Sequence, residues 1–184
     1  MSKSSAAPII INGWRLFAHP LFLDQLECLI ADVQRLRRKD PERYRSNSSS
    51  KRLAAVMRLI LNDIPQDPGR KEYRQGSTLG SAHRHWHRAK FFQQYRLFFR
   101  FHSRSKVIVL GWVNDTDTKR TYGSKTDAYR AFQSMLANGQ PPNDWDELLR
   151  EASQAIERMS RITTRSMDAD GSSLAASSGT TVPS

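Results

Sequence analysis

The chain has 184 residues and a formal net charge of +11, from 29 lysines and arginines against 18 aspartates and glutamates. This length suits one domain with short ends and is too small for two comfortable ones. The single cysteine, Cys28, excludes a disulfide framework within the chain, and no apolar run approaches the roughly 20 residues of a membrane-spanning helix. The excess of cations favours a polyanionic partner such as RNA, and we expect a soluble cytoplasmic protein with no membrane contact.

Two amphipathic helices are predicted in the first third of the chain. Between Pro20 and Arg38, apolar residues recur at spacings of three and four. A basic run ends this helix, where cations suit the helix dipole; contact with phosphate is the alternative role of that run. The helical period returns after the serines at 48–50 and continues to Pro65, so the two helices should pack as a hairpin.

Beyond a loop rich in glycine, proline and charge, the apolar period changes from that of a helix to that of a strand. Three consecutive strands are predicted at 86–92, 95–101 and 106–113, separated by short polar turns that fit antiparallel pairing. The last of them, KVIVLGWV, is apolar on both faces and should lie inside the sheet. The fold class is therefore α+β, with a helical hairpin packed on an antiparallel sheet of three or more strands.

Helices are predicted again after the strands. The sequence SKTD at Ser124 has the pattern of a capping box, and Asn143 or Asp144 caps a further helix through about Arg161. The polar, small residues that follow have almost nothing to bury. We therefore expect one domain over 12–162, a flexible N-terminus at 1–11, and a disordered tail at 163–184.

Side chains alternate faces along a strand, so the register decides which residues can act together. The apolar face of the second strand, which we expect to contact the core, is formed by Tyr95, Leu97, Phe99 and Phe101. The opposite face carries the cations Arg88, Lys90, Arg96 and Arg100, interleaved with Trp86 and Phe98. Cations beside aromatic rings are typical of surfaces that bind single-stranded nucleic acid. The alternative is a solvated sheet face without a ligand, against which the absence of any acidic residue from Gln75 to Asn114 argues.

The histidines of this region admit a second interpretation. His83, His85 and His87 are two residues apart and could share a strand face as zinc ligands. That face continues into Ala89 and Phe91, however, and no cysteine or carboxylate lies near to complete a zinc site. We therefore expect no metal and no other cofactor, with His87 turned toward the core at the margin of the RNA-binding face.

Several separate motifs resemble one known family. They are NGWRLFAHPLF near the start, then WHRAKF, YRLFFR, VIVLGWVND, RTYG and KTDAYRAF, and GQPPNDW near the end. Together they resemble the YhaV toxins of bacterial type II toxin–antitoxin modules, over about Asn12 to Trp145. These toxins belong to the RelE-like group of small ribonucleases, which have a helical hairpin on an antiparallel sheet. The resemblance implies an mRNA interferase that arrests growth, in some cases on ribosomes. It also implies a PrlF-type antitoxin with an AbrB-like DNA-binding fold, through which alone the toxin would meet DNA.

The resemblance also implies roles for particular residues. Lys90 and Arg96 match basic residues on the sheet strands of RelE-like toxins, and Arg88 occupies a neighbouring basic position. Arg120 and Tyr122 match a second arginine and an aromatic residue of the group. The tract between Lys90 and Arg96 is shorter than in relatives, which weakens the match of Lys90. The catalytic candidates are thus Arg96, Lys90, Arg120 and Tyr122, with RNA binding by Arg88, Arg100, Trp86, Phe98 and His87.

These residue types suit RNA cleavage without a metal ion. The 2'-hydroxyl of RNA can attack the adjacent phosphate, and arginine is permanently charged with a planar fork that matches phosphate oxygens. We assign Arg96 and Arg120 to phosphate contact and rank Lys90 and Tyr122 first for proton transfer. His85 or His87 is the generic alternative as base. A non-enzymatic nucleic-acid-binding regulator would use the same basic face and is the competing function.

Overall fold

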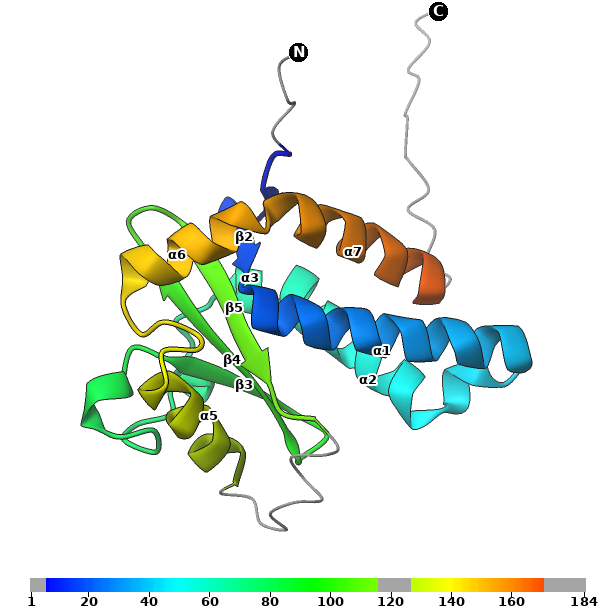
Figure 1. Ribbon diagram of the computed structural model, residues 1–184, viewed down its shortest axis with the longest axis horizontal. Coiled ribbons are helices and arrows are strands. Elements are labelled where there is room, and N and C mark those ends of the chain that lie inside the picture. Colours follow the sequence, from blue (N-terminus) through cyan, green and yellow to red (C-terminus); the bar gives the residue numbers. More distant parts are fainter. Residues whose placement is uncertain (1–5, 116–126, 171–184) are drawn as a thin grey trace, which may run out of the picture.

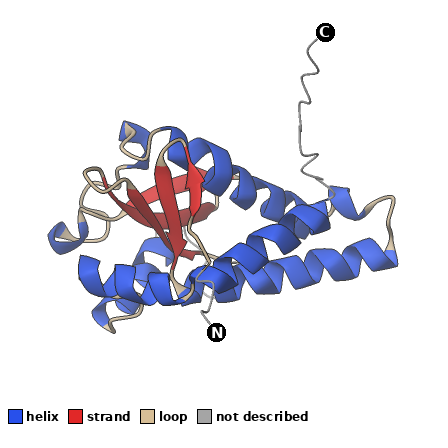
Figure 2. Ribbon diagram, turned by 90° about the horizontal axis from the view of Figure 1, so that it is seen from above, coloured by secondary structure: helices blue, strands red, loops and turns tan. Residues whose placement is uncertain are grey.

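The computed structural model describes residues 6–115 and 127–170 and has helices on both faces of one sheet (Figures 1 and 2). The strands are β1 (Ile9–Ile11), β2 (Trp14–Ala18), β3 (His87–Phe91), β4 (Tyr95–His102) and β5 (Val107–Val113). The α-helices are α1 (Pro20–Lys39), α2 (Ser48–Arg58), α3 (Ile64–Gln66), α5 (Asp127–Ala137), α6 (Trp145–Gln154) and α7 (Ile156–Asp170). A π-helical turn, η2 (Leu59–Asp63), joins α2 to α3, and short 3-10 turns are η1 (Tyr44–Ser46), η3 (Lys71–Tyr73) and η4 (Ser81–His83).

The sheet has the strand order β1-β2-β5-β4-β3. Its β5-β4-β3 half is antiparallel, as the sequence predicts, and β5 lies inside the sheet. The other half was not predicted: β1 and β2 form a hairpin through Asn12 and Gly13, both at positive φ, and β2 pairs parallel to β5. The α+β class and the helical hairpin are confirmed, but the sheet is mixed rather than purely antiparallel.

Both faces of the sheet are buried. On one face, α1, α2 and α7 enclose a core that includes Leu97 and Phe99 from β4. On the other face, α5 and α6 enclose a second core around Phe98 and Phe132. Alternation along the strands therefore serves two cores, because apolar residues on either side of a strand each need a covering layer.

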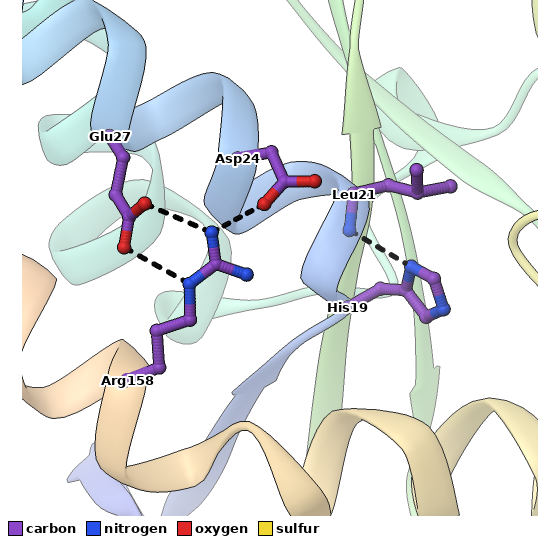
Figure 3. Close-up of polar contacts among 5 residues, drawn as sticks. All are labelled: His19, Leu21, Asp24, Glu27 and Arg158. Atoms are coloured by element: carbon purple, nitrogen blue, oxygen red, sulfur yellow. Dashed lines mark hydrogen bonds and ion pairs between the residues drawn. The ribbon is translucent and has the colours of Figure 1, made fainter.

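The C-terminal helices hold the first helix in place. His19 caps α1, with Nδ1 accepting from the backbone N–H of Leu21 at 3.2 Å, and its Nε2 bonds to Glu151 of α6 at 2.5 Å. In α7, the guanidinium of Arg158 donates to Glu27 at 3.0 Å and also to Asp24 (Figure 3). These bonds lower the pKa of Glu27. They fix α7 along α1, as Figure 1 shows.

Three predicted boundaries differ from those of the structure. The single helix predicted through Arg161 is divided in two, because α6 ends at Gln154 and α7 begins at Ile156, with Ala155 between them. Helix α7 continues to Asp170, where Ala169 is still buried against the core, although the sequence predicts disorder from 163. At the other end, β1 lies within the segment expected to be flexible. The capping box at Ser124 lies outside the described residues.

Gly111 of β5 lets the side chain of Trp86 pack directly against the backbone of the sheet. It sits at a register shift between β4 and β5, and Trp86 lies fully buried over it. A Cβ added at Gly111 would be 2.6 Å from Cζ3 of Trp86 and 3.3 Å from the carbonyl oxygen of Phe98. Only glycine leaves room for the indole at this point.

We expect Gly111→Ala to destabilise the protein by roughly 1–3 kcal/mol, because the new methyl group overpacks a buried ring. Urea unfolding followed by circular dichroism measures the loss. The matched control is Gly69→Ala, whose Cβ would meet no atom closer than 3.4 Å and should change stability by less than about 0.5 kcal/mol. Equal stability of the two variants would show that Trp86 does not pack on Gly111.

Candidate functional site

The predicted register of β3 and β4 is confirmed. Lys90 pairs with Arg96, and Arg88 pairs with Phe98, so these side chains share one face of the sheet. Ala89 is fully buried on the opposite face, in the core beneath α1. The cations therefore do gather on one face, as alternation predicts.

That face is not an open surface. Trp86 and Phe98 are fully buried, and the ring of Phe132 in α5 lies with its centroid 5.0 Å from Trp86 and 4.3 Å from Phe98. Neither ring has a free face on which a base could stack in this conformation. The prediction that these two aromatics form an RNA-stacking surface is wrong for this arrangement, because the apolar side of α5 covers the middle of the face.

The cations of β3 and β4 lie in different places around α5. The Nε of Arg88 donates to the hydroxyl of Tyr129 in α5 at 2.6 Å, and its Nη1 donates to the carbonyl of Glu72 at 2.7 Å. Arg88 thus ties β3 to α5 and to the preceding loop. Lys90 and Arg96 lie beside the β3–β4 turn, and Arg100 lies four residues further along β4.

We call Lys90, Arg96 and Asn114 the turn site. Arg96 is only 6% exposed, and its Nη1 donates to the carbonyls of Gln93 at 2.7 Å and Tyr95 at 3.0 Å. Asn114, which sequence reasoning missed, accepts from the backbone N–H of Arg96 at 2.6 Å and donates to the carbonyl of Gln94 at 2.9 Å. Both side chains therefore hold the turn that they flank.

The turn itself is strained. Phe92 and Gln93 have φ values of 45° and 58°, a conformation that costs side-chain-bearing residues free energy. Phe92 is also 53% exposed, which is unusual for so large an apolar side chain. It is an exposed aromatic ring beside the turn site, whereas Trp86 and Phe98 are buried.

The cations of the turn site have no carboxylate partner among the ion pairs of the described residues. Within residues 6–115 and 127–170, neither Lys90 nor Arg96 forms an ion pair with a carboxylate, and the buried Nε of Arg96 has no hydrogen-bond acceptor. A buried donor without an acceptor costs free energy, and an ion or ligand that supplies the missing acceptor is one way in which that cost is offset. An anion such as a phosphate has the required charge and oxygens. Arg120 and Tyr122 lie outside the described residues.

The histidines form a second group around Asn143, which sequence reasoning placed only as a possible helix cap. Its Oδ1 lies 3.0 Å from Nδ1 of His83, 2.8 Å from Nε2 of His85 and 3.2 Å from Nε1 of Trp86. The backbone carbonyl of Asn143 accepts from Nη1 of Arg100 at 2.7 Å. This contact brings together three segments that are far apart in the sequence.

His87 does not join the other histidines. Its ring packs 4.8 Å from the ring of Phe101 and 5.7 Å from that of Phe99, and its Nδ1 is 3.1 Å from the carbonyl of His85. The expectation that His87 turns toward the core is confirmed. Burial lowers the pKa of His85 and of His87, so both rings favour the neutral form.

Comparisons with known proteins show the family of this chain. A family model described as a toxin with endonuclease activity, of a toxin–antitoxin system, matches residues 16–153. The chain is 46% identical over 149 residues to "Ribonuclease toxin YhaV" of Escherichia coli K12, covering 80% of this chain and 97% of that protein. It is 45% identical over 150 residues to "Toxin YhaV" of Escherichia coli O6:H1, with the same coverage. No solved structure matches the chain significantly.

The fold is that of an α+β protein with one mixed sheet covered by helices on both faces, and the family model adds endonuclease activity. The chain belongs to the family of YhaV toxins, the endonuclease components of toxin–antitoxin systems. The resemblance carried by the sequence motifs is confirmed.

The lowered pKa values of His85 and His87 predict a pH-dependent stability. Below the ordinary histidine pKa of about 6.5, the unfolded chain binds protons that the folded chain resists, so the free energy of unfolding should fall as the pH drops. Urea unfolding at about pH 7.5 and at about pH 5.5 measures the difference. The fall should be smaller in the double variant H85Q/H87Q and unchanged in His102→Gln, which removes an exposed histidine. A double variant as pH-sensitive as the wild type would show that these rings titrate normally.

Proposed function

We propose that this chain is a toxin that cuts messenger RNA at the turn site. The observation that supports it is the buried guanidinium of Arg96, whose Nε has no acceptor among the described residues, in a chain of an endonuclease family. RNA is the proposed substrate because the Escherichia coli K12 relative is named a ribonuclease. Cleavage of messages, on or off the ribosome, would stop translation and growth.

The proposed reaction needs only groups of the RNA and of the protein. The 2'-hydroxyl oxygen loses its proton to a base and attacks the adjacent phosphorus. The bond to the 5'-oxygen of the next nucleotide breaks, and that oxygen takes up a proton. The products are a 2',3'-cyclic phosphate and a free 5'-hydroxyl. Negative charge increases on the phosphate oxygens in the transition state, and fixed cations stabilise that charge.

Arg96 is the residue best placed to stabilise it. Its Nη1 is already engaged by two turn carbonyls, which fixes the plane of the guanidinium and leaves Nε as a donor. A preorganised donor pays little free energy for orientation when charge develops. Because Arg96 is buried, the turn at Phe92 and Gln93 would have to move before a phosphate could reach its Nε, and the strained backbone of that turn favours such a change.

Lys90 is the proposed base or the partner that positions the attacking hydroxyl. It is exposed and lies directly across from Arg96 in the β3–β4 register. Arg120 and Tyr122 are proposed, from the family resemblance, to contact the phosphate and to assist proton transfer. Arg88 would act through α5, because its Nε already donates to Tyr129.

The proposed partner that keeps the toxin inactive is a PrlF-type antitoxin. An acidic segment of the antitoxin would neutralise Lys90 and Arg96 and cover the exposed ring of Phe92. DNA would be bound by the AbrB-like part of that antitoxin and not by this chain. No helix among the described residues is long and apolar enough to cross a membrane.

Replacing Arg96 tests the proposed function. Both Arg96→Ala and Arg96→Gln should reduce RNA cleavage on the order of 100–1,000-fold, as loss of a transition-state hydrogen-bond donor does. Growth arrest on induction should be lost in parallel. Circular dichroism and urea unfolding would show whether each variant is folded.

The charge-matched control is Arg38→Ala, an exposed position at the end of α1. It should cut RNA at nearly the wild-type rate. A folded Arg96 variant that cuts as fast as this control would remove Arg96 from the catalytic site. A wild-type chain that binds RNA without cutting it would favour the non-enzymatic regulator.

A further inference from the structure

Arg100 is a second cation without a counter-ion. It is half-buried, and no carboxylate among the described residues lies within ion-pair distance of it. Its guanidinium carbon lies 5.8 Å from the ring centroid of Trp86 and 5.2 Å from that of Trp145. The two rings and the carbonyl of Asn143 fix the direction of the guanidinium, and only Nη1 is used in that bond. Such a group is ready to bind an anion.

The hydrogen bonds around Asn143 fix the protons of the neighbouring histidines. Trp86 Nε1 can only donate, so the atom of Asn143 that faces it must be the amide oxygen. The ring nitrogens that face this oxygen, Nδ1 of His83 and Nε2 of His85, therefore carry protons. The other nitrogen of each ring has no hydrogen bond to another described residue.

These groups lie together around one anchor. Arg100 bonds to the carbonyl of Asn143 and His85 bonds to its side-chain oxygen, so the two groups lie near each other. Burial lowers the pKa of Arg100 to about 10, so it is still charged at neutral pH. Asp144, the carboxylate that acts on Arg100 from a distance, is engaged in capping α6 through the N–H of Glu147 at 2.9 Å.

This group of residues is separate from the turn site. Arg96 and Arg100 are four residues apart on one strand, a separation of about 13 Å at 3.3 Å per residue. Phe98 lies between them and is covered by Phe132 of α5. One phosphate cannot contact both arginines, whereas a strand of RNA can reach both by following β3, which is the edge strand of the sheet.

We propose that Arg100, His83 and His85 form a second RNA subsite, which binds an internucleotide phosphate away from the bond that is cut. The proposal rests on the proposed ribonuclease function of the turn site. The subsite holds the RNA strand in position along the protein. It therefore changes the affinity for the substrate and not the rate of the chemical step. The anchor of the subsite is Asn143, and Trp145 forms its wall.

The test separates affinity from catalysis. The probe is a short RNA that the wild type cuts at one mapped position, together with its uncleavable version carrying a 2'-deoxy residue at that position. Arg100→Gln should raise KM about tenfold to 100-fold with kcat nearly unchanged, because it removes a charge-assisted hydrogen bond made equally in the ground state and the transition state. His83→Gln should also raise KM. Arg38→Ala is again the charge-matched control.

Shortening the RNA identifies the subsite directly. As nucleotides are removed from either end, anisotropy should show one step at which the wild type loses affinity for the uncleavable RNA. Arg100→Gln should lose nothing at that step, whereas Arg96→Gln should lose as much as the wild type.

The subsite would be overturned if Arg100→Gln lowered kcat and left KM unchanged. It would also be overturned if Arg100→Gln lost as much affinity as the wild type at every shortening of the RNA. If the wild type cuts no RNA, the proposed function fails, and the anisotropy series still decides whether the subsite exists.

Discussion

The packing of α5 against the sheet determines where the cations of β3 and β4 can act. The ring of Phe132 contacts three aromatic rings of the sheet, with centroids 5.0 Å from Trp86, 4.3 Å from Phe98 and 5.7 Å from Trp112. This aromatic cluster is fully or almost fully buried. It fills the middle of the face, so the cations that flank it lie in two separate places.

Each of those places is held by an asparagine that bonds to several segments. Asn114 fixes the β3–β4 turn beside Arg96, and Asn143 gathers the histidines and Arg100. In both, backbone carbonyls set the direction of an arginine, and that arginine forms no ion pair with a carboxylate of residues 6–115 or 127–170. Fixed cations of this kind favour an anionic ligand over a protein counter-ion, because binding then requires no break of an existing ion pair. The two places together suit a polymer with repeated phosphates.

Local sequence patterns were sufficient for β3, β4 and β5 and for the faces of these strands, because alternation depends only on neighbouring residues. They predicted that Leu97 faces one core and that Arg96 and Lys90 share the other face. They did not predict that α5 covers this face, although KVIVLGWV, apolar on both sides, indicated two covering layers. The hairpin at Asn12 and Gly13 was missed as well, although Asn-Gly between apolar runs is a strong hairpin signal.

The anchors of the two sites depend on long-range contacts and could not be read from spacing. Asn143 lies 58 residues from His85, and Asn114 lies 18 residues from Arg96. The sequence spaces His83, His85 and His87 as a possible metal site, but the same contacts point their rings to different partners. His87 packs against Phe101, while the other two rings turn to Asn143.

The chemistry of the RNA ends tests the central claim most directly. RNA incubated with the purified chain in the presence of a chelator should be cut into fragments that end in a 2',3'-cyclic phosphate and begin with a free 5'-hydroxyl. Mass spectrometry of the fragments distinguishes these ends from the 3'-hydroxyl and 5'-phosphate that attack by water leaves. Fragments of the second kind, or loss of cleavage on chelation, would contradict cleavage by the 2'-hydroxyl with Arg96 as the cation that stabilises the transition state.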